Sequence, residues 1–390
     1  MGGKQNPRTR RNVVKSIGGA AAIAALAGCS GAGGGGGGSG GSTDTDASTS
    51  TDSSTSSGAS NVEITLAGTG GSWGDARANA FYDPFRNGEM AWDEEHKLTF
   101  SSVPSEQYTS SLKRSPENPQ YDLVELDGQR AELLGKRGAA AKQADVIDNF
   151  DNVADAYKND YMGGTTVFPR GLAYRKDKLD VEIEEWDDLI DPALRGKVSI
   201  GSWDQAGSKY FFAINHAKGG TLDDLEPGFN WLREFIDVTD PKITTSTDQA
   251  MQFWRNGEVY AAPFLSARVD QLRNDQGYDM AFAIPTGGMV MDYWGYPMMK
   301  HTSDDKKQVA MEFLEGAFDP EVQANFAESF GYPPATPDSY EFISDEAKER
   351  HPTMILSDEQ ISRFDMGIDW TRVAEMSPEV GQEWRKIVSQ

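Results

Sequence analysis

From Val62 onward, the hydrophobic and polar positions of the chain alternate between the period of a strand and the period of a helix. Val62–Ala67 is a short apolar run that predicts a buried strand, and Asp75–Phe85 places its apolar residues on one helical face. The alternation then predicts strands at KLTFSSV and YDLVEL, a helix over Ser105–Arg114 that begins with Ser105 as its cap, and a short helix through Leu133.

A second series of the same kind follows. It predicts strands at GKVSI, VYAAPF and MAFAIP, and helices at GSKYFFAINHAKGG, TDQAMQFWRNG and SARVDQLRND. From about Asp304 the pattern is mainly helical. Strands separated by helices favour parallel sheets covered on both faces, and the chain is longer than one compact α/β core usually is. We therefore expect an α/β protein with two lobes, and a ligand beyond the carboxyl ends of the strands, at GTGGSWGD and DGQR.

Residues 1–29 have the pattern of an export signal. Arg10 and Arg11 precede an apolar stretch at 17–27, which is too short for a bilayer core that needs about 20 residues. The segment resembles a twin-arginine signal followed by a lipoprotein processing box, in which Cys29 becomes the lipidated first residue. The alternative, a buried free thiol, has no surrounding element to bury it. Residues 30–60 are mainly Gly, Ser, Thr and Asp, so we expect a flexible tether there.

The charge balance of the chain is strongly acidic. It carries 37 Lys and Arg against 61 Asp and Glu, a formal net charge of −24. Nucleic-acid binding needs clustered cations that displace counterions from phosphates, so this balance argues against a nucleic-acid partner. A hydrated acidic surface is expected of a protein that works at high salt, and the alternative is a surface built for a cationic partner. A single cysteine excludes an internal disulfide.

Several motifs between residues 62 and 339 follow the order of a known family. They are GGSWGDARANAFYDPF, YDLVELDG, GLAYRKDKL, EEWDDLIDPALRGKV, AAPFLSAR, a Gly-Gly followed by MD at 287–292, and FGYPPATPDS. In this order they resemble the spermidine/putrescine-type periplasmic solute-binding proteins of ABC importers. The resemblance implies a two-lobe periplasmic-binding-protein fold, type II-like, with the ligand in an interlobe cleft that closes by hinge motion. It implies lobe one at 61–167 plus 294–390, and lobe two at 168–293.

The resemblance also implies part of the ligand site. It places an amine-binding aspartate at Asp292, beside Trp294, and it puts Phe264 where polyamine binders have a tryptophan, just ahead of Ser266. A cationic solute taken out of water needs carboxylates to replace its hydration and aromatic faces to hold its methylenes.

Two residues of the first lobe are further candidates. Asp127 ends the third predicted strand, at the edge that faces the cleft, but an Asp before Gly128 is also a common turn former. Trp73, in the first loop beside Ser72, is the aromatic of that lobe best placed to face the cleft, and simple core packing is its alternative.

Other positions depart from the polyamine pattern. Around SWDQAGSKYF, where polyamine binders have acidic residues, this chain has Ser208 at the helix start and Asp204 displaced from it. Arg268, in the helix after APFLS, is a candidate for the cleft, with a solvated helix face as its alternative. A helix start with exposed amides and a nearby Arg favours an anion. A zwitterionic solute or a thiamine-like cation therefore stays open beside a polyamine.

Two other functions compete with solute binding. Related ferric-ion binders clamp the metal with paired tyrosines, but this chain has no Tyr-Tyr dipeptide and its four histidines show no close ligand spacing. GGSWG matches the Gly-x-Ser-x-Gly of a serine hydrolase with Ser72 as nucleophile, and a glycine-rich ligand loop is the alternative. In α/β-hydrolases several strands precede that motif, whereas here it follows the first strand. We expect no catalytic residue and no metal.

Together, these patterns predict an exported, lipid-anchored solute-binding protein at the extracytoplasmic face of a membrane. It captures a small organic solute, with polyamines as the leading class, and delivers it to the permease and ATPase subunits of an ABC transporter. The chain has no Gly-x-x-x-x-Gly-Lys-[Ser/Thr] phosphate loop, so the ATPase is a separate subunit. No cofactor is expected, and the mechanism works in a monomer. The predicted ligand-binding residues are Ser72, Trp73, Asp127, Asp204, Ser208, Phe264, Ser266, Arg268, Asp292 and Trp294.

The anchor prediction is tested by Cys29→Ala. Without the thiol no lipid is attached, so we expect the variant to move from the membrane fraction to the soluble fraction, as measured by immunoblot after ultracentrifugation. If the variant stays in the membrane fraction as firmly as the wild type, Cys29 is not the anchor and the intact signal holds the protein there.

Overall fold

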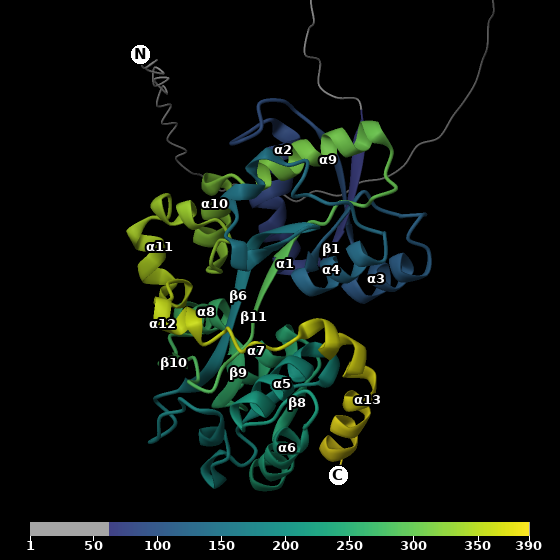
Figure 1. Ribbon diagram of the computed structural model, residues 1–390. Helices are drawn as coiled ribbons and strands as arrows, with labels where there is room; N and C mark the ends of the chain where they lie inside the picture. The colour runs from purple at the N-terminus through teal and green to yellow at the C-terminus, as the bar shows by residue number, and fades with distance from the viewer. Residues whose placement is uncertain (1–61, 390) are drawn as a thin grey trace, which may run out of the picture. The chain divides into compact units, whose positions relative to one another are not determined.

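The computed structural model describes residues 62–389 (Figure 1). The predicted export signal with Arg10 and Arg11, the lipid attachment at Cys29 and the tether at 30–60 lie outside these residues. The described residues belong to one compact unit. Within them, no helix combines the length and the apolar character that a membrane span requires.

The strands of the described residues follow most of the predicted runs. They are β1 (Glu63–Gly68), β2 (Lys97–Ser102), β3 (Leu123–Val124), β4 (Leu126–Asp127), β5 (Lys158–Asn159), β6 (Met162–Arg175), β7 (Ser199–Gly201), β8 (Lys242–Thr244), β9 (Ala261–Leu265), β10 (Met280–Ala283) and β11 (Met291–Gly295).

The helices likewise agree with most of the apolar periodicity. They are α1 (Gly71–Arg77), α2 (Asp83–Asn87), α3 (Ser105–Arg114), α4 (Gly128–Lys136), α5 (Ser208–Ala217), α6 (Glu226–Thr239), α7 (Thr247–Arg255), α8 (Ser266–Gln276), α9 (Asp304–Ala317), α10 (Pro320–Phe330), α11 (Asp345–Arg350), α12 (Asp358–Ser362) and α13 (Trp370–Val388). A π-helical turn joins α1 to α2, and another precedes α5.

Helix ends show where local sequence chemistry succeeds and fails. α10 begins with Pro320 after Asp319, whose carboxylate accepts from a first-turn N–H, and it ends at Gly331 with a φ of 81°. The predicted cap of α3 is wrong. Pro104 occupies the cap position, and Ser105 is the first helical residue. The Ser105 hydroxyl instead accepts from Arg130 Nη1 at 2.7 Å and donates to Glu106 of the same helix.

The strand β6 connects two sheet regions with different partners. β1 is the centre of a parallel sheet in the order β2-β1-β3, and β7 pairs with β8 in parallel. β6 is antiparallel to β5 and β11 along 162–169, and antiparallel to β9 and β10 along 170–175. Figure 1 shows β6 and β11 side by side, between the elements around β1 and those around β9. The alternation of strand and helix patterns did not predict these antiparallel pairings. They arise because β9, β10 and β11, which come later in the chain, pair with β6.

Each half of β6 supports its own hydrophobic core. Val167 and Phe168 pack in a first core with side chains of β1, α9 and α10, whereas Leu172 and Tyr174 pack in a second core with α5 and α6. We call the part of the molecule around the first core lobe one and the part around the second core lobe two. This is the two-lobe α/β fold that the sequence predicted.

The C-terminal helix is placed differently from its prediction. The sequence assigned 294–390 to lobe one, but the apolar face of α13 packs in the core of lobe two. Its Trp384 ring lies 6.1 Å from the ring of Trp203, centroid to centroid. An amphipathic pattern shows that a helix covers a core, but not which of two cores accepts it. The other lobe boundaries stay predictions.

A buried ion pair holds the loops of lobe one together. Arg77 and Glu125 are both fully buried, with 3.1 Å between Arg77 Nε and Glu125 Oε1. Glu125 also accepts from Trp73 Nε1 at 2.9 Å, and Arg77 Nη1 donates to Thr165 Oγ1 at 3.0 Å. Burial raises the pKa of Glu125, and the charge of Arg77 opposes this rise. Because Glu125 lies between β3 and β4, the pair fixes the backbone that leads to Asp127.

We predict that Glu125→Gln destabilises the protein by about 3–5 kcal/mol, because it leaves the charge of Arg77 buried without a counter-ion. Urea denaturation measures the change. Glu346→Gln is the matched control, since Glu346 pairs with Arg350 at the surface and its loss should leave the midpoint unchanged. Equal midpoints for Glu125→Gln and the wild type would show that the buried pair does not stabilise lobe one.

Candidate functional site

Two cations converge on Asp292, in β11. Its carboxylate is 4% exposed and accepts from Lys209 Nζ at 2.5 Å. The Nε and Nη2 atoms of Arg170 each lie 3.4 Å from Asp292 Oδ2. Lys209 is in the first turn of α5, in lobe two, and Arg170 lies on β6 where the strand passes from one core to the other. Asp292 therefore joins the crossing strand to lobe two.

A second carboxylate, Asp127, lies beside this group. It ends β4 and caps α4, accepting from the backbone N–H of Arg130 at 3.0 Å and from Arg130 Nε at 2.5 Å. Burial by itself raises the pKa of Asp127, but the charges of Arg130 and Lys209 and the hydrogen bonds from Arg130 lower it to about 2. Asp127 is therefore ionised at neutral pH.

Aromatic groups border the two carboxylates. β11 pairs with β4 so that Trp294 is opposite Asp127. The half-buried Trp294 ring lies 5.7 Å from Phe168 and 5.8 Å from the guanidinium carbon of Arg130. Tyr210 Oη accepts from Arg170 Nη1 at 3.1 Å. We call the whole group the central cluster: Asp127, Arg130, Arg170, Lys209, Tyr210, Asp292 and Trp294.

The central cluster opens onto a small polar pocket of lobe two. It has a volume of about 10 Å³, which is room for about one water molecule. An organic solute therefore needs a movement of the surrounding elements to enter. The lining residues are Arg170, Ser199, Gly201, Gln205, Tyr210, Thr244, Thr247, Ala250, Pro263, Phe264 and Leu265.

Several predicted ligand residues are near one another in the structure. Asp127, Asp292 and Trp294 belong to the central cluster, and Phe264 lines the pocket while its ring packs 6.0 Å from Trp254. Ser208 immediately precedes Lys209 at the start of α5.

The start of α8 lies next to Arg170 of the central cluster. β9 pairs with β6 so that Arg170 is opposite Leu265, the residue before α8. Ser266 and Arg268, both predicted for the site, are in the first turn of this helix. The guanidinium of Arg268 lies over the Phe330 ring at 4.9 Å, and the side chain is partly exposed.

Three predicted residues lie outside this group. Asp204 is on the surface and pairs with Arg385 of α13 at 3.0 Å, because the π-helical turn directs it toward that helix. Trp73 follows its alternative reading, since it packs among Phe168, Phe326 and other rings of the first core. Ser72 is exposed at the start of α1, and no hydrogen bond among residues 62–389 joins it to a histidine.

The sequence did not single out four members of the central cluster, although the first of them lies in the DGQR loop expected near the ligand: Arg130, Arg170, Lys209 and Tyr210. A signal existed for one of them, because Arg170 is the only charged residue in the long apolar run of β6 before its last residue. Burial lowers the pKa of Arg170, but Tyr210 and Asp292 raise it above its usual value. Its partner Asp292 is 122 residues away in the chain, which no local pattern reveals.

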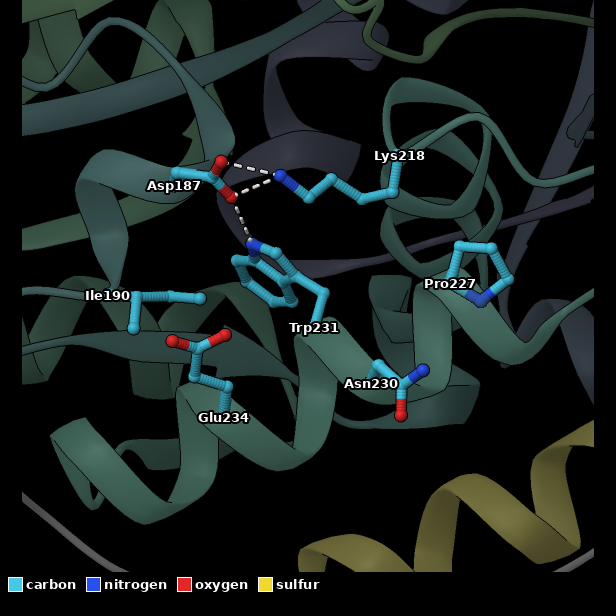
Figure 2. A pocket seen from close by; sticks show the side chains of 7 residues that line it. All are labelled: Asp187, Ile190, Lys218, Pro227, Asn230, Trp231 and Glu234. Atoms are coloured by element: carbon cyan, nitrogen blue, oxygen red, sulfur yellow. Dashed lines mark hydrogen bonds and ion pairs between the residues drawn. The ribbon is translucent and has the colours of Figure 1, made fainter.

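Another pocket, of about 510 Å³, lies on α6 in lobe two (Figure 2). Its one buried aromatic, Trp231, donates from Nε1 to Asp187 Oδ1 at 3.1 Å, and Lys218 Nζ lies 2.6 Å from the same oxygen. Asp187, Lys218 and Trp231 thus already satisfy one another, and none of the predicted ligand-binding residues lines this pocket. Among residues 62–389, no His, Cys, Asp and Glu side chains group in threes as metal ligands.

Comparisons with known proteins agree with this architecture. An ABC transporter protein from Clostridium perfringens is 19% identical, with a TM-score of 0.66, and the match covers 84% of this chain and 100% of that one. The binding protein AgtB of A. tumefaciens R10, in complex with agropinic acid, is 18% identical with a TM-score of 0.63, covering 85% and 99%.

A spermidine/putrescine ABC transporter substrate-binding protein, PotD of Streptococcus pneumoniae, is 14% identical with a TM-score of 0.63, covering 84% of this chain and 99% of that one. No curated relative matches the sequence. The family described as bacterial extracellular solute-binding protein matches residues 82–354, which is most of the chain. The chain therefore belongs to the bacterial extracellular solute-binding protein family.

Proposed function

We propose that the protein is the solute-binding component of an ABC importer and that it captures a small organic solute at the central cluster. The observation that carries this proposal is the convergence of Arg170 of β6 and Lys209 of α5 on Asp292 of β11, the strand whose Trp294 lies opposite Asp127 of β4. Such a mixture of a few polar anchors and aromatic faces is typical of sites for small molecules.

A change in the angle between the lobes would admit the solute. The lobes are joined by β6 and β11, two neighbouring strands that act as a hinge in this proposal. The pocket holds about 10 Å³, so an organic solute enters when lobe two moves away and Lys209 leaves Asp292. Closure then traps the solute, and the closed form is the one that the permease recognises.

A polyamine is the solute class that the sequence favours, and PotD is named for spermidine and putrescine. In this chain, however, both carboxylates of the central cluster already have internal cations. Arg130 occupies Asp127, while Lys209 and Arg170 occupy Asp292. An amine of the solute has to compete with these groups. An acidic solute without an amine does not have to displace these cations from the carboxylates, and AgtB is described in complex with agropinic acid.

The same proposal includes export and attachment. A captor held by a lipid at Cys29 and a tether at 30–60 remains close to its permease, so the local concentration of the closed form stays high. Each captor works alone, as a monomer, because both lobes of its site come from one chain.

Solute capture is tested by thermal shift at high salt with polyamines, amino acids, organic acids, thiamine and ferric ion. A solute present at 100 times its dissociation constant should stabilise the protein by about 2.7 kcal/mol. We predict that Trp294→Ala lowers the affinity for the best solute at least about tenfold in calorimetry, because an aromatic anchor is lost.

The matched control is Phe342→Ala, which removes an aromatic side chain that is 51% exposed on the surface. It should leave the affinity unchanged. The proposal fails if no solute of the panel shifts the melting temperature, or if Trp294→Ala and Phe342→Ala bind the solute equally well.

A further inference from the structure

Arg268 carries a charge without a counter-ion. Its Nη1 donates to Gln271 Oε1 at 2.7 Å, and its guanidinium carbon lies 4.9 Å from the centroid of the Phe330 ring. Its Nε is buried and has no hydrogen-bond partner. Among the ion pairs within residues 62–389, those of the central cluster engage Arg130, Arg170 and Lys209, and none engages Arg268. A buried N–H of a cation that lacks an acceptor is costly, so an acceptor absent from the chain itself would complete it.

A second polar group next to Arg268 is also without a partner. Ser266 is 0% exposed, and its hydroxyl has no hydrogen bond. It is the first residue of α8, an 11-residue helix whose preceding residue, Leu265, provides no side-chain cap. The first-turn N–H groups of such a helix carry positive partial charge and favour an anion.

Arg170 adjoins the same helix start. The pairing of β6 with β9 places Arg170 opposite Leu265. The charges of both arginines act on the phenol of Tyr332. Burial raises the pKa of this phenol, whereas the charges of Arg268 and Arg170 and a side-chain hydrogen bond with Arg268 lower it, so Tyr332 engages part of the guanidinium while Arg268 Nε stays without an acceptor. The Tyr332 ring also packs 5.8 Å from Phe330, over which Arg268 lies.

The charge of the site is opposite to that of the chain. The central cluster and Arg268 together provide four cations (Arg130, Arg170, Lys209 and Arg268) against three carboxylates, Asp127, Asp292 and the Glu106 that pairs with Arg130, in a chain with a formal net charge of −24. A diamine adds positive charge to this excess, whereas a carboxylate neutralises part of it.

We propose that the captured solute carries a carboxylate, and that Arg268 and Arg170 bind this group at the start of α8, with the Ser266 hydroxyl as a further donor. The inference rests on the proposed function, since it names the chemical class of the solute taken at that site. Arginine suits the role because its planar group offers two parallel N–H donors to a carboxylate.

The test uses two matched series in which only the end groups change. The first is succinate, 4-aminobutyrate and 1,4-diaminobutane, and the second is glutarate, 5-aminovalerate and 1,5-diaminopentane. Calorimetry and thermal shift on the full chain should show binding of carboxylates in at least one series, and weaker binding of the diamine in that series.

Variants locate the carboxylate. Arg268→Met should lower the affinity for the bound carboxylate by about tenfold to a hundredfold, in line with the loss of a charged hydrogen bond. Arg268→Lys should retain more affinity than Arg268→Met, because it keeps the charge. Arg255→Met is the matched control, since Arg255 is exposed at the end of α7, and its affinity should equal that of the wild type. Melting temperatures without solute show whether each variant is folded. Ser266→Ala removes only a hydroxyl, so it should lower the affinity for the carboxylate severalfold.

The outcomes separate the inference from the proposed function. If the diamines bind more tightly than the carboxylates, or if Arg268→Met and Ser266→Ala both bind carboxylates as the wild type does, the inference is wrong while solute capture stands. If neither these series nor the wider panel of solutes binds, solute capture itself fails.

Discussion

The fold depends on one strand that belongs to two cores. β6 contributes Val167 and Phe168 to lobe one and Leu172 and Tyr174 to lobe two, so neither core is complete without it. Between these halves lies Arg170, whose guanidinium reaches Asp292 and Tyr210. A charged residue at that point is stable because its N–H groups have acceptors. The same constraint places a polar site where the two lobes meet.

Electrostatics then distinguishes the site from the rest of the molecule. An acidic chain repels anions at long range, although salt of about 0.1 M largely screens this repulsion at distances beyond about 10 Å. Local cations therefore decide what binds. Arg130 and Asp127 satisfy each other, as do Lys209 and Asp292, and Arg268 is left with capacity for a ligand. Asp127 and Asp292 thus orient the cations of the site, in addition to being possible partners for an amine of the solute.

Sequence patterns were sufficient for most elements of the fold. Periodicity predicted the mainly helical character of the chain after Asp304, and the rule that ligands bind beyond strand ends made Asp127 a candidate. Composition showed that the chain is acidic, but it could not show that cations gather at one place. Arg170 was missed because a single charge in an apolar run has no local partner. Its role becomes visible only when β11 brings Asp292 beside it.

Two other differences have a similar cause. The position of Trp73 in the sequence fitted both a ligand loop and a core. Trp73 lies in the core because its Nε1 donates to the buried carboxylate of Glu125. Asp204 was close to the helix start in sequence, but the π-helical turn moved it to the surface beside Arg385. In both cases the deciding contact comes from residues that are distant in the chain, which a local pattern does not contain.

The most direct test of the account is a crystal structure of the protein with the solute that raises its melting temperature most. The account predicts electron density for the solute between the lobes, in contact with Arg170 and Trp294, with Lys209 no longer on Asp292. Density for the solute at another place, such as the pocket beside Asp187, with the central cluster unchanged, would contradict it.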